Sequence, residues 1–481
     1  MDADGALKLL NRIYRRLAQR RPFLDETERY YKGEHPLRYA TEEWRTANAD
    51  RYRGFSDNWC RPVVDAEAER LDVIGIKTGN TSIDSLWRQW RLNEMESQSS
   101  QGFVASLTGS RSFVIVWGDS SGQPLITWEH ASQVEIEYDW ANRRTRTAAI
   151  KTWIDETTEY ATLYEPDAVW KFQRQRVEAL NDRTSQAFQA RQQIAGADGG
   201  WVARLGVDAT WPIANPLGVV PVVEIPNRPL LAADPISEVV GPMAMQNAIN
   251  LLWAYLFLAA DYASMPARVV LHQGPPKMPI LDKTTGEVIG ERPIALEELA
   301  SKRMLYLQGQ STDIKSWDAA KLDVFTDVIE KAVAHIAAQT RTPPHYLMVN
   351  QGLSNLSGDA IAAAEAGLVK KAMEFQLHAT PAIREVFRLA ALVLDDRALA
   401  DTARTATVKW SNPGIRTEAQ MADALLKKRQ VGYPFEYLLE LDDVGPEDID
   451  RIMQMKADES IDPQLSAAVK GLTGQGASGG A

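Results

Sequence analysis

The sequence is short of cysteine. Cys60 is the single cysteine among 481 residues, which excludes an intrachain disulfide framework and any zinc site built on two or more cysteines. Such cysteine usage is typical of a reducing compartment. The first residues, MDADGALKLLNRIYRRL, also lack the order of charged, apolar and small residues that marks a signal peptide. We therefore expect a product that is cytosolic or is assembled from the cytosol.

Positive charge is also in deficit. The 53 lysines and arginines face 64 aspartates and glutamates, and the formal net charge is −11 at pH 7. A protein that coats nucleic acid needs a large basic face, because neutralised phosphates supply most of its affinity. The composition therefore argues against a coat protein for nucleic acid. It does not exclude a protein that DNA merely passes.

Signatures of catalysis and metal binding are scarce. The sequence has no G-x-x-x-x-G-K-[ST] phosphate loop and no H-E-x-x-H pair, so it predicts neither P-loop nucleotide hydrolysis nor a zinc protease. The six histidines are scattered, without a pair at ligand spacing, and each is interpreted as a surface or packing residue. We expect no enzyme, no cofactor and no metal site.

The N-terminal region predicts helices rich in charge. Apolar residues recur at helical spacing from Leu9 to Leu17, and Pro22 is expected to close this helix. Residues 25–62 predict a short helix and a loop, and the next helix runs through VVDAEAERLDVIG. The arginines of this region could bind polyanions, but acids interleave with them almost one for one. This pattern favours ion pairs on a surface that is solvated or faces another subunit.

Residues 112–225 change to a period of two. Six short runs rich in Val, Ile, Thr, Tyr and Trp (SFVIVWGD, PLITWE, SQVEIEYD, TAAIKTWID, TEYATLYE and AVWKFQ) are mostly separated by turn-like stretches. They predict an antiparallel meander in one β-rich domain. A polar insert at 179–200 is interpreted as a flexible loop, and residues 215–229 as a final strand that ends in a proline turn.

Two long helices are predicted on either side of a small α/β excursion. Residues 242–263 form a helix of roughly 22 residues, about 33 Å long, and residues 318–339 form the second. The first is apolar over 248–260, but its four polar positions lie too close together for a membrane span (Gln246, Asn247, Asn250 and Asp261). Between the helices we expect a strand, a hairpin, a short helix over 296–303 and another strand.

The rest of the chain alternates between helices and loops. A polar loop over 342–357 precedes a helix at 359–379, for which Ser357 suits the N-cap, and Pro381 should kink or end that helix. Residues 406–414 predict one more strand, which could join the distant meander. Two or three short amphipathic helices follow, and the last residues predict a disordered tail.

The order of these elements resembles that of the portal proteins of long-tailed bacteriophages. Four stretches carry the resemblance: LDETERYYKGEHPLRYA, NPLGVVPVVEIPNRP, PMAMQNAINLLWAYLFLAADYASMPARVVL and PPHYLMVNQGLSNLSGDAIAAAEAGLVKKA. They resemble, in turn, the family's N-terminal segment, the strand before the first stem helix, that helix leading into the clip, and the tunnel loop with its following helix. The resemblance covers residues 1–457.

The resemblance implies an α+β, portal-type multidomain fold with a β-rich wing, long stem helices, a small α/β clip and a helical crown. Its parts would be 1–235 (wing, N-terminal helices and meander), 236–265 (first stem helix), 266–316 (clip), 317–341 (second stem helix), 342–357 (tunnel loop), 358–414 (kinked wing helix and returning strand), 415–457 (crown) and 458–481 (disordered tail).

The resemblance also implies a function and partners. Such portals form a ring of about twelve subunits at one capsid vertex, through which double-stranded DNA is packaged and ejected. They dock the terminase large subunit and head-completion or adaptor proteins through the clip, and they associate with major capsid and scaffolding proteins. The protein would reside in the virion, and in the host cytoplasm during assembly. Lys283 and Glu287, at the hairpin tip, are plausible docking points.

Two groups of residues are candidates for facing DNA. Asp323, Asp327 and Glu330 share one helical face, away from the apolar seam of Leu322, Phe325, Ile329, Ala332 and Ile336. An acidic lining would let DNA pass, whereas a ring of lysines would hold it. An ordinary solvated face fits the same pattern.

The second group is carried over from the family's tunnel loop and comprises Asn350, Gln351, Leu353, Ser354 and Asn355. The polar members of this group can make weak, sequence-independent hydrogen bonds to phosphates. A plain connection between helices with a capping serine also fits. Lys370 and Lys371 are candidate phosphate contacts too, or ion-pair partners of acids in the next subunit.

Other functions stay open at this point. The main alternative is another head–tail connector or minor capsid protein, although such a protein has no evident need for two long helices around a clip. A carboxylate-dependent hydrolase lacks a supported acid pair. A membrane pore conflicts with the short apolar run and the missing signal.

Overall fold

The computed structural model divides into two compact units. The first comprises Met1–Glu34, Asn58–Met243 and Ile336–Ala481, and the second His35–Asp57 and Ala244–His335. The structure describes residues 1–35, 40, 42, 55–77, 85–175, 199–206, 208, 210–264, 268–271, 277–281, 288–293, 304–307, 321–347, 358–414, 418–442, 444–446 and 448–457.

Helix α1 (Ala3–Lys32) is longer than predicted, because Pro22 lies inside it. Asp2 caps its start by accepting a hydrogen bond from the Gly5 N–H at 2.9 Å, and Gly33, with φ of 83°, ends it in the left-handed region that glycine tolerates. The prediction that Pro22 closes the helix is wrong. Apolar side chains are buried at helical spacing on both sides of the proline, from Leu17 to Leu24, and this packing outweighs the lost backbone hydrogen bond.

The helix predicted through Gly75 ends earlier. Helix α3 spans Cys60–Ala68, and a turn then leads into strand β1 (Val73–Lys77). Strand β1 pairs antiparallel with β15 (Thr407–Trp410). The returning strand therefore exists, but it joins β1 in a two-stranded sheet and does not join the meander.

Two helices that the sequence analysis did not assign follow, α4 (Ser85–Leu92) and α5 (Met95–Gly109). Helix α5 lies against strand β3, and a Cβ atom at Gly102 would stand only 1.9 Å from Cε2 of Trp128. Glycine at this position is what permits the close approach of helix and sheet.

The six predicted strands are all present: β2 (Arg111–Gly118), β3 (Pro124–Glu129), β4 (Val134–Tyr138), β5 (Arg146–Asp155), β6 (Thr158–Tyr164) and β7 (Ala168–Gln175). They divide between two sheets, whereas one continuous meander was expected. Strand β10 (Val222–Pro226) pairs with β2 to give the order β10-β2-β3. The second sheet runs β4-β5-β6-β7-β8, with β8 at Val202–Ala203, while β9 (Ile213–Ala214) also pairs with β7.

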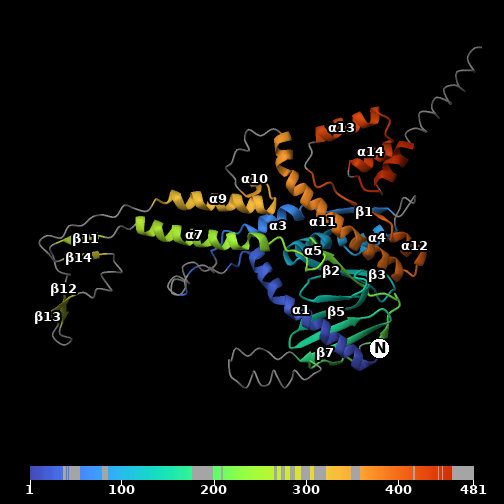
Figure 1. Ribbon diagram of the computed structural model, residues 1–481, viewed down its shortest axis with the longest axis horizontal. Coiled ribbons are helices and arrows are strands. Elements are labelled where there is room, and N and C mark those ends of the chain that lie inside the picture. The colour runs from blue at the N-terminus through green and yellow to red at the C-terminus, as the bar shows by residue number, and fades with distance from the viewer. Residues whose placement is uncertain are drawn as a thin grey trace, which may run out of the picture. The chain divides into compact units, whose positions relative to one another are not determined.

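Three apolar cores join these elements in the first unit. Helix α1 lies along the six-stranded sheet (Figure 1), where Leu10 and Ile13 share a core with Ile150 and Phe172. A second core joins the two sheets through Phe113, Val134 and other residues. The largest core joins helices α3, α4, α5 and α11 with β1 and β2. These cores hold α1 and α11 in fixed positions on the sheets.

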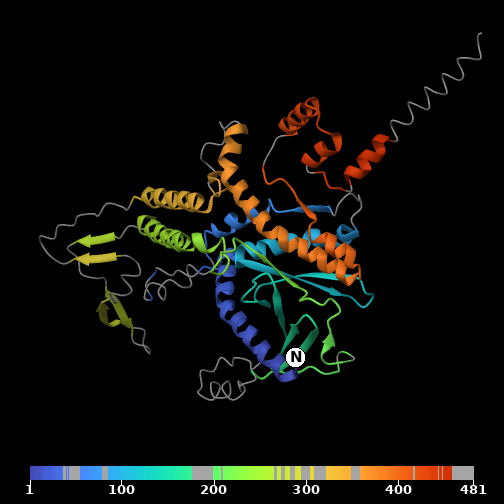
Figure 2. The same ribbon diagram turned by 45° about the vertical axis from the view of Figure 1, so that its right-hand side comes forward.

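Helix α11 (Gly358–Val393) runs through Pro381, so the proline does not end it. Its ribbon bends along its length in Figure 2, and the Thr380 hydroxyl, next to the proline, donates to the Gln376 carbonyl at 2.6 Å. Helix α12 (Arg397–Ala403) follows. The predicted short C-terminal helices are present as α13 (Glu418–Gln430), α14 (Phe435–Leu441) and a helical stretch at 448–457. The predicted tail lies outside the described residues.

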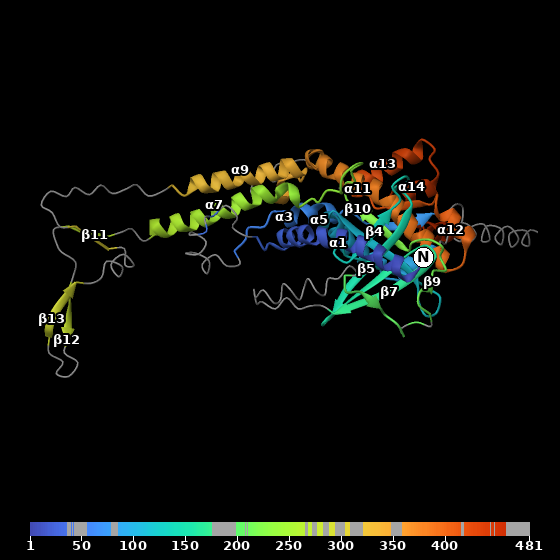
Figure 3. The same ribbon diagram turned by 60° about the horizontal axis from the view of Figure 1, so that its bottom comes forward.

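The second unit contains most of the two long helices, α7 (Val240–Ser264) and α9 (Asp323–Thr340), which lie side by side in Figures 1 and 3. Four strands were also predicted there. Strand β11 (Arg268–Leu271) pairs in parallel with β14 (Met304–Leu307), and β12 (Lys277–Leu281) pairs with β13 (Val288–Pro293) as the expected hairpin. The short helix expected at 296–303 lies outside the described residues.

Helix α7 passes a test for membrane spanning by length and composition alone. Within the part of the chain that the structure describes, Val240–Ala260 is the one stretch that does so. Helices buried in soluble proteins pass the same test. Its polar residues Gln246, Asn247 and Asn250 are buried in this unit, which favours protein neighbours over lipid.

Candidate functional site

Helix α9 exposes three carboxylates and buries part of its apolar surface, although Val324 and Val328 are also exposed. Asp323, Asp327 and Glu330 are all exposed, while Ile329 and Ile336 are buried. The remaining members of the predicted seam are buried or half-buried (Leu322, Phe325 and Ala332). Within the described residues, α9 thus presents an acidic face to its surroundings, and nothing on that face neutralises the three carboxylates by an ion pair.

The predicted loop residues Asn350, Gln351, Leu353, Ser354 and Asn355 lie outside the described residues, as do Lys283 and Glu287 of the hairpin tip. The structure does describe what flanks the loop. Helix α10 (Pro344–Leu347) comes before it and α11 after it.

Lys371, a candidate phosphate contact, is buried and paired within its own chain. Its Nζ lies 2.8 Å from Oε2 of Glu67 on α3 and 2.7 Å from Oε2 of Glu238, which precedes α7. Arg228 approaches the other oxygen of Glu238 at 3.1 Å. Burial raises the pKa of Glu67 to about 7, against the opposing effect of Lys371. The prediction of a DNA or subunit contact at Lys371 is therefore wrong, whereas Lys370 is exposed.

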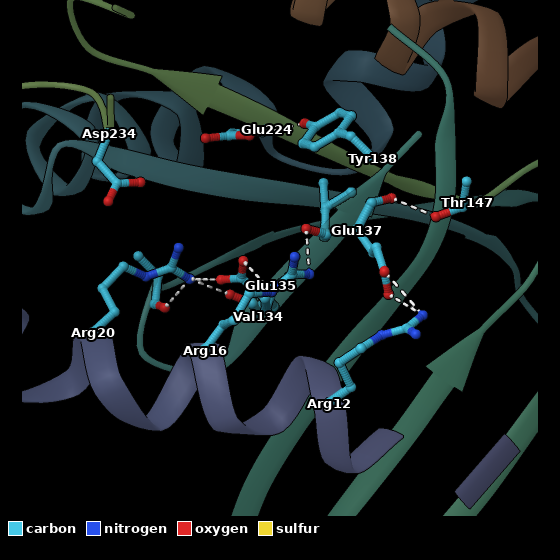
Figure 4. Close-up of polar contacts among 12 residues, drawn as sticks. Arg12, Arg16, Arg20, Val134, Glu135, Glu137, Tyr138, Thr147, Glu224 and Asp234 are labelled. Carbon is cyan, nitrogen blue, oxygen red and sulfur yellow. Dashed lines mark hydrogen bonds and ion pairs between the residues drawn. The ribbon is translucent and has the colours of Figure 1, made fainter. Parts of the chain in front are cut away.

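The N-terminal arginines also pair within the chain. Figure 4 shows Arg12, Arg16 and Arg20 pointing from α1 toward the acids of β4. Nη2 of Arg12 lies 2.9 Å from Oε1 of Glu137, and Nη2 of Arg20 lies 2.6 Å from Oε2 of Glu135. Burial lowers the pKa of Arg20 and raises that of Glu135, because both charges have left water. These ion pairs fasten α1 to the sheet through acids distant in the sequence, whereas the sequence analysis expected pairs with interleaved acids on a surface that is solvated or faces another subunit.

Beside these pairs lies a cavity of about 620 Å³, formed by α1, the start of β2, β4 and the turn before α7. Arg111 in its wall pairs with Glu224 at 3.2 Å and with Asp234. Its basic side chains are thus already engaged by acids of the same chain. The cavity does not offer an uncompensated basic surface for DNA.

The polar residues of α7 bind the segment that precedes α3. The Asn250 side-chain oxygen accepts a hydrogen bond from the Asp57 N–H at 3.1 Å. The Gln246 side-chain amide donates a hydrogen bond to the Asp57 carbonyl. The Trp253 indole N–H donates one to the Asp57 carboxylate at 2.7 Å. Phe55 packs edge-on against Phe257. These contacts explain why an otherwise apolar helix carries buried polar residues.

Cys60 is buried, and burial raises the pKa of its thiol to about 12. A thiol in such surroundings stays protonated and is a poor nucleophile or metal ligand. Within the described ranges, no group of three or more His, Cys, Asp or Glu side chains could hold a metal ion.

Comparison with known families decides between the alternatives. A protein-family model described as phage portal protein, SPP1 Gp6-like, matches residues 10–461. The chain belongs to this portal protein family. The family expected from the order of the elements is confirmed, and the chain is accordingly a structural component of a phage virion.

Relatives agree with this assignment. The portal protein of Mycobacterium phage L5 is 27% identical over 383 residues, which cover 76% of this chain and 71% of that protein. The portal protein of Mycobacterium phage D29 is 27% identical over 384 residues, with the same coverage. A solved structure titled "Virion of native gene transfer agent (GTA) particle" covers 78% of this chain and 85% of that chain at 10% identity, with a TM-score of 0.36.

Sequence reasoning missed the buried charges of this portal protein. Among the described residues, the most enclosed ion pairs join Arg70 to Glu365 and Lys371 to Glu67 and Glu238, and no spacing rule joins these partners. One signal was available, since Glu365 stands alone among small residues in AIAAAEAGLV. A single charge inside an apolar helical pattern is expensive to bury unless it has a partner.

Proposed function

We propose that this portal protein forms a ring of about twelve copies, through whose channel double-stranded DNA enters and leaves the capsid. The acidic face of α9 would line the channel. The observation that carries this proposal is the separation on α9 of exposed Asp323, Asp327 and Glu330 from buried Ile329 and Ile336. Acids repel a passing polyanion, so the duplex is not trapped by counterion release.

The surface of α7 supports the ring. Its apolar side chains from Leu251 to Trp253 and from Phe257 to Ala260 are only half-buried within one chain, and Tyr255 is exposed. A helix whose apolar surface exceeds what its own chain covers has area left for a neighbour. In a closed ring each subunit supplies that neighbour through the same pair of surfaces.

The parts of the chain take their proposed roles from the family. Residues 1–235 and 358–414 would form the wing, 236–265 and 317–341 the stem, 266–316 the clip, 342–357 the tunnel loop and 415–457 the crown. The clip would dock the terminase large subunit and then the head-completion or adaptor protein. Capsid and scaffolding proteins would bind the outside of the ring, and no enzymatic step falls to this chain.

Imaging tests the ring. Purified protein examined by negative-stain microscopy, alone and after coexpression with the capsid and scaffolding proteins, should show rings with a central hole. A population that stays monomeric in both preparations would contradict the proposal.

Charge reversal tests the channel. The variant Asp323→Lys/Asp327→Lys/Glu330→Lys should form rings that retain duplex DNA at about 50 mM salt and lose at least about tenfold in retention by 200 mM. A matched control reverses three exposed acids of the first unit, Asp25→Lys/Asp155→Lys/Asp167→Lys. If the α9 variant packages DNA at the parental rate, or if the control retains DNA equally, the acidic face does not line the channel.

A further inference from the structure

Arg70 occupies a junction between elements that are far apart in the sequence. It follows α3 in the turn before β1, and its guanidinium reaches three partners. Nη1 donates to the Pro413 carbonyl at 2.5 Å. Nη2 donates to the Tyr346 hydroxyl at 2.7 Å and to Oε2 of Glu365 at 3.1 Å.

The partners belong to the two ends of one segment. Tyr346 lies on α10, which ends at Leu347, and Glu365 lies in the third turn of α11, which begins at Gly358. We propose that Arg70 is a positioning residue that holds α10 and α11, the helices that flank residues 348–357, at a fixed separation, anchored to the α3 turn and to the chain after β15. The inference rests on the proposed function, in which that segment faces DNA.

Burial makes this junction specific. The side chains of Arg70 and Glu365 are 8% and 2% exposed. An ion pair removed from water is stable only in good geometry and with its remaining hydrogen bonds satisfied. The planar fork of arginine serves three acceptors at once, whereas the ammonium group of lysine is a single point of charge at the end of a flexible chain. Lysine therefore cannot replace Arg70 here, although it keeps the charge.

Other contacts near this junction are weaker than the hydrogen bonds of the Arg70 guanidinium. The His345 ring approaches Oε1 of Glu365 at 3.3 Å, and the Arg70 guanidinium lies 5.9 Å from the centre of the Tyr346 ring. Arg341, at the end of α9, pairs with Glu374 of α11 at 3.8 Å, but both side chains are largely exposed. Exposed pairs contribute little, and His345 makes one contact with Glu365 where the guanidinium binds three acceptors. Among the described residues, the buried guanidinium is therefore the main link between α10 and α11.

The test measures the separation of the two ends directly. Spin labels go on cysteines introduced at Pro344 and Ala366, which are exposed on either side of the segment, while buried Cys60 stays unlabelled. Pulsed electron resonance on assembled rings should give a narrow distance distribution for the parent. Arg70→Gln and Arg70→Lys should each widen it by about twofold or more, because neither side chain restores the three-way contact.

Two further variants keep the result interpretable. Arg61→Gln removes an exposed arginine of α3 that pairs with Asp65, and it should leave the distribution narrow. Tyr346→Phe removes one acceptor and should widen the distribution less than Arg70→Lys, so it decides the matter if the Arg70 variants do not fold. A distribution that stays narrow in Arg70→Lys and in Tyr346→Phe would overturn the inference.

Packaging separates this inference from the proposed function. DNA packaged per particle should fall at least about tenfold in rings of Arg70→Gln and not in rings of Arg61→Gln. If the distance distribution widens while packaging stays parental, the junction holds the segment but the segment does not face DNA, and the tunnel-loop role proposed for residues 342–357 is at fault. If packaging falls with the distribution unchanged, Arg70 does not act by positioning, and the inference fails.

Discussion

Helices α9 and α11 are both long, and each carries carboxylates, but the carboxylates differ in burial. On α11, Glu365 is 2% exposed and is paired with Arg70, and Lys371 on the same helix is fully enclosed by Glu67 and Glu238. On α9, Asp323, Asp327 and Glu330 all face outward. The buried charges of α11 fix that helix in the fold. The exposed carboxylates of α9 stay available to interact with solvent ions or with another molecule.

This difference follows from the energetics of burial. A charge that leaves water must recover its hydration energy from a partner in well-defined geometry, so a buried pair specifies one arrangement of its elements. An exposed charge specifies nothing locally, yet its field acts on other ions within about a Debye length. Substitution of the buried charges of α11 should therefore lower the free energy of unfolding strongly, whereas substitution of the exposed acids of α9 should change it little.

The largest effect should come from Lys371→Met. The substitution removes the ion pair described for Glu67 and leaves Glu238 with Arg228, and losing one member of a buried pair costs about 3–5 kcal/mol. Urea unfolding at pH 8 should show this loss as a lower midpoint. Lys370→Met, at the exposed neighbouring position, is the control and should change the free energy of unfolding by no more than about 0.5 kcal/mol. Equal effects of the two variants would show that Lys371 is not buried as described.

The same cluster should respond to pH through Glu67. Its folded pKa of about 7 lies above the usual value of 4.5, chiefly because burial disfavours the charged form. The folded state then binds the proton more tightly, so this group adds stability below pH 4.5 and loses it as pH rises to about 7. The free energy of unfolding of the parent, minus that of Glu67→Gln, should fall by about 1–3 kcal/mol between pH 5 and pH 8. A difference that rises over this range would contradict the assigned direction.

How far the sequence predicts this molecule depends on how local each signal is. Strands such as β5 and β6 show alternation because one face packs on α1, and that periodicity can be recognised without tertiary structure. Strand β1 could not be recognised, since its five residues continue a helical pattern and its partner β15 lies hundreds of positions away. Pro22 misled for the same reason, because the packing on both sides of it outweighs a local preference.

The site shows the same limit. Asp323, Asp327 and Glu330 share a face by helical geometry alone, and the structure places them all outward. Lys370 and Lys371 look alike in the sequence, and only the folded chain distinguishes the exposed lysine from the buried one. Arg70 and Glu365 are 295 positions apart, so no spacing could pair them. The deepest charges are thus the least predictable.

A smaller effect is expected where the second unit uses neutral hydrogen bonds. Asn250→Ala removes the acceptor of the Asp57 N–H and the contacts to the Gln246 and His35 side chains. The Asp57 N–H bond is half-buried, so leaving this donor unsatisfied should cost about 1 kcal/mol, the lower end of the range for buried donors. Because the loss is local, amide hydrogen exchange at residues 55–59 should accelerate while that of β5 and β6 does not change. Tyr255→Ala, at an exposed position on the same helix, should not accelerate exchange at 55–59. Acceleration in both variants would assign the effect to α7 as a whole.

The smallest effect on the isolated chain should come from Asp323→Asn/Asp327→Asn/Glu330→Gln. These side chains are exposed, so each change should alter the free energy of unfolding by less than about 0.5 kcal/mol. In assembled rings the sign becomes informative. If the carboxylates converge on a channel, their mutual repulsion weakens the ring, and the amide variant should melt at a higher temperature than the parent at low salt, with the difference shrinking as salt screens the charges. Carboxylates engaged in subunit contacts would give the reverse, a ring weakened by the amides, and the acidic face of α9 would then belong to an interface and not to a channel.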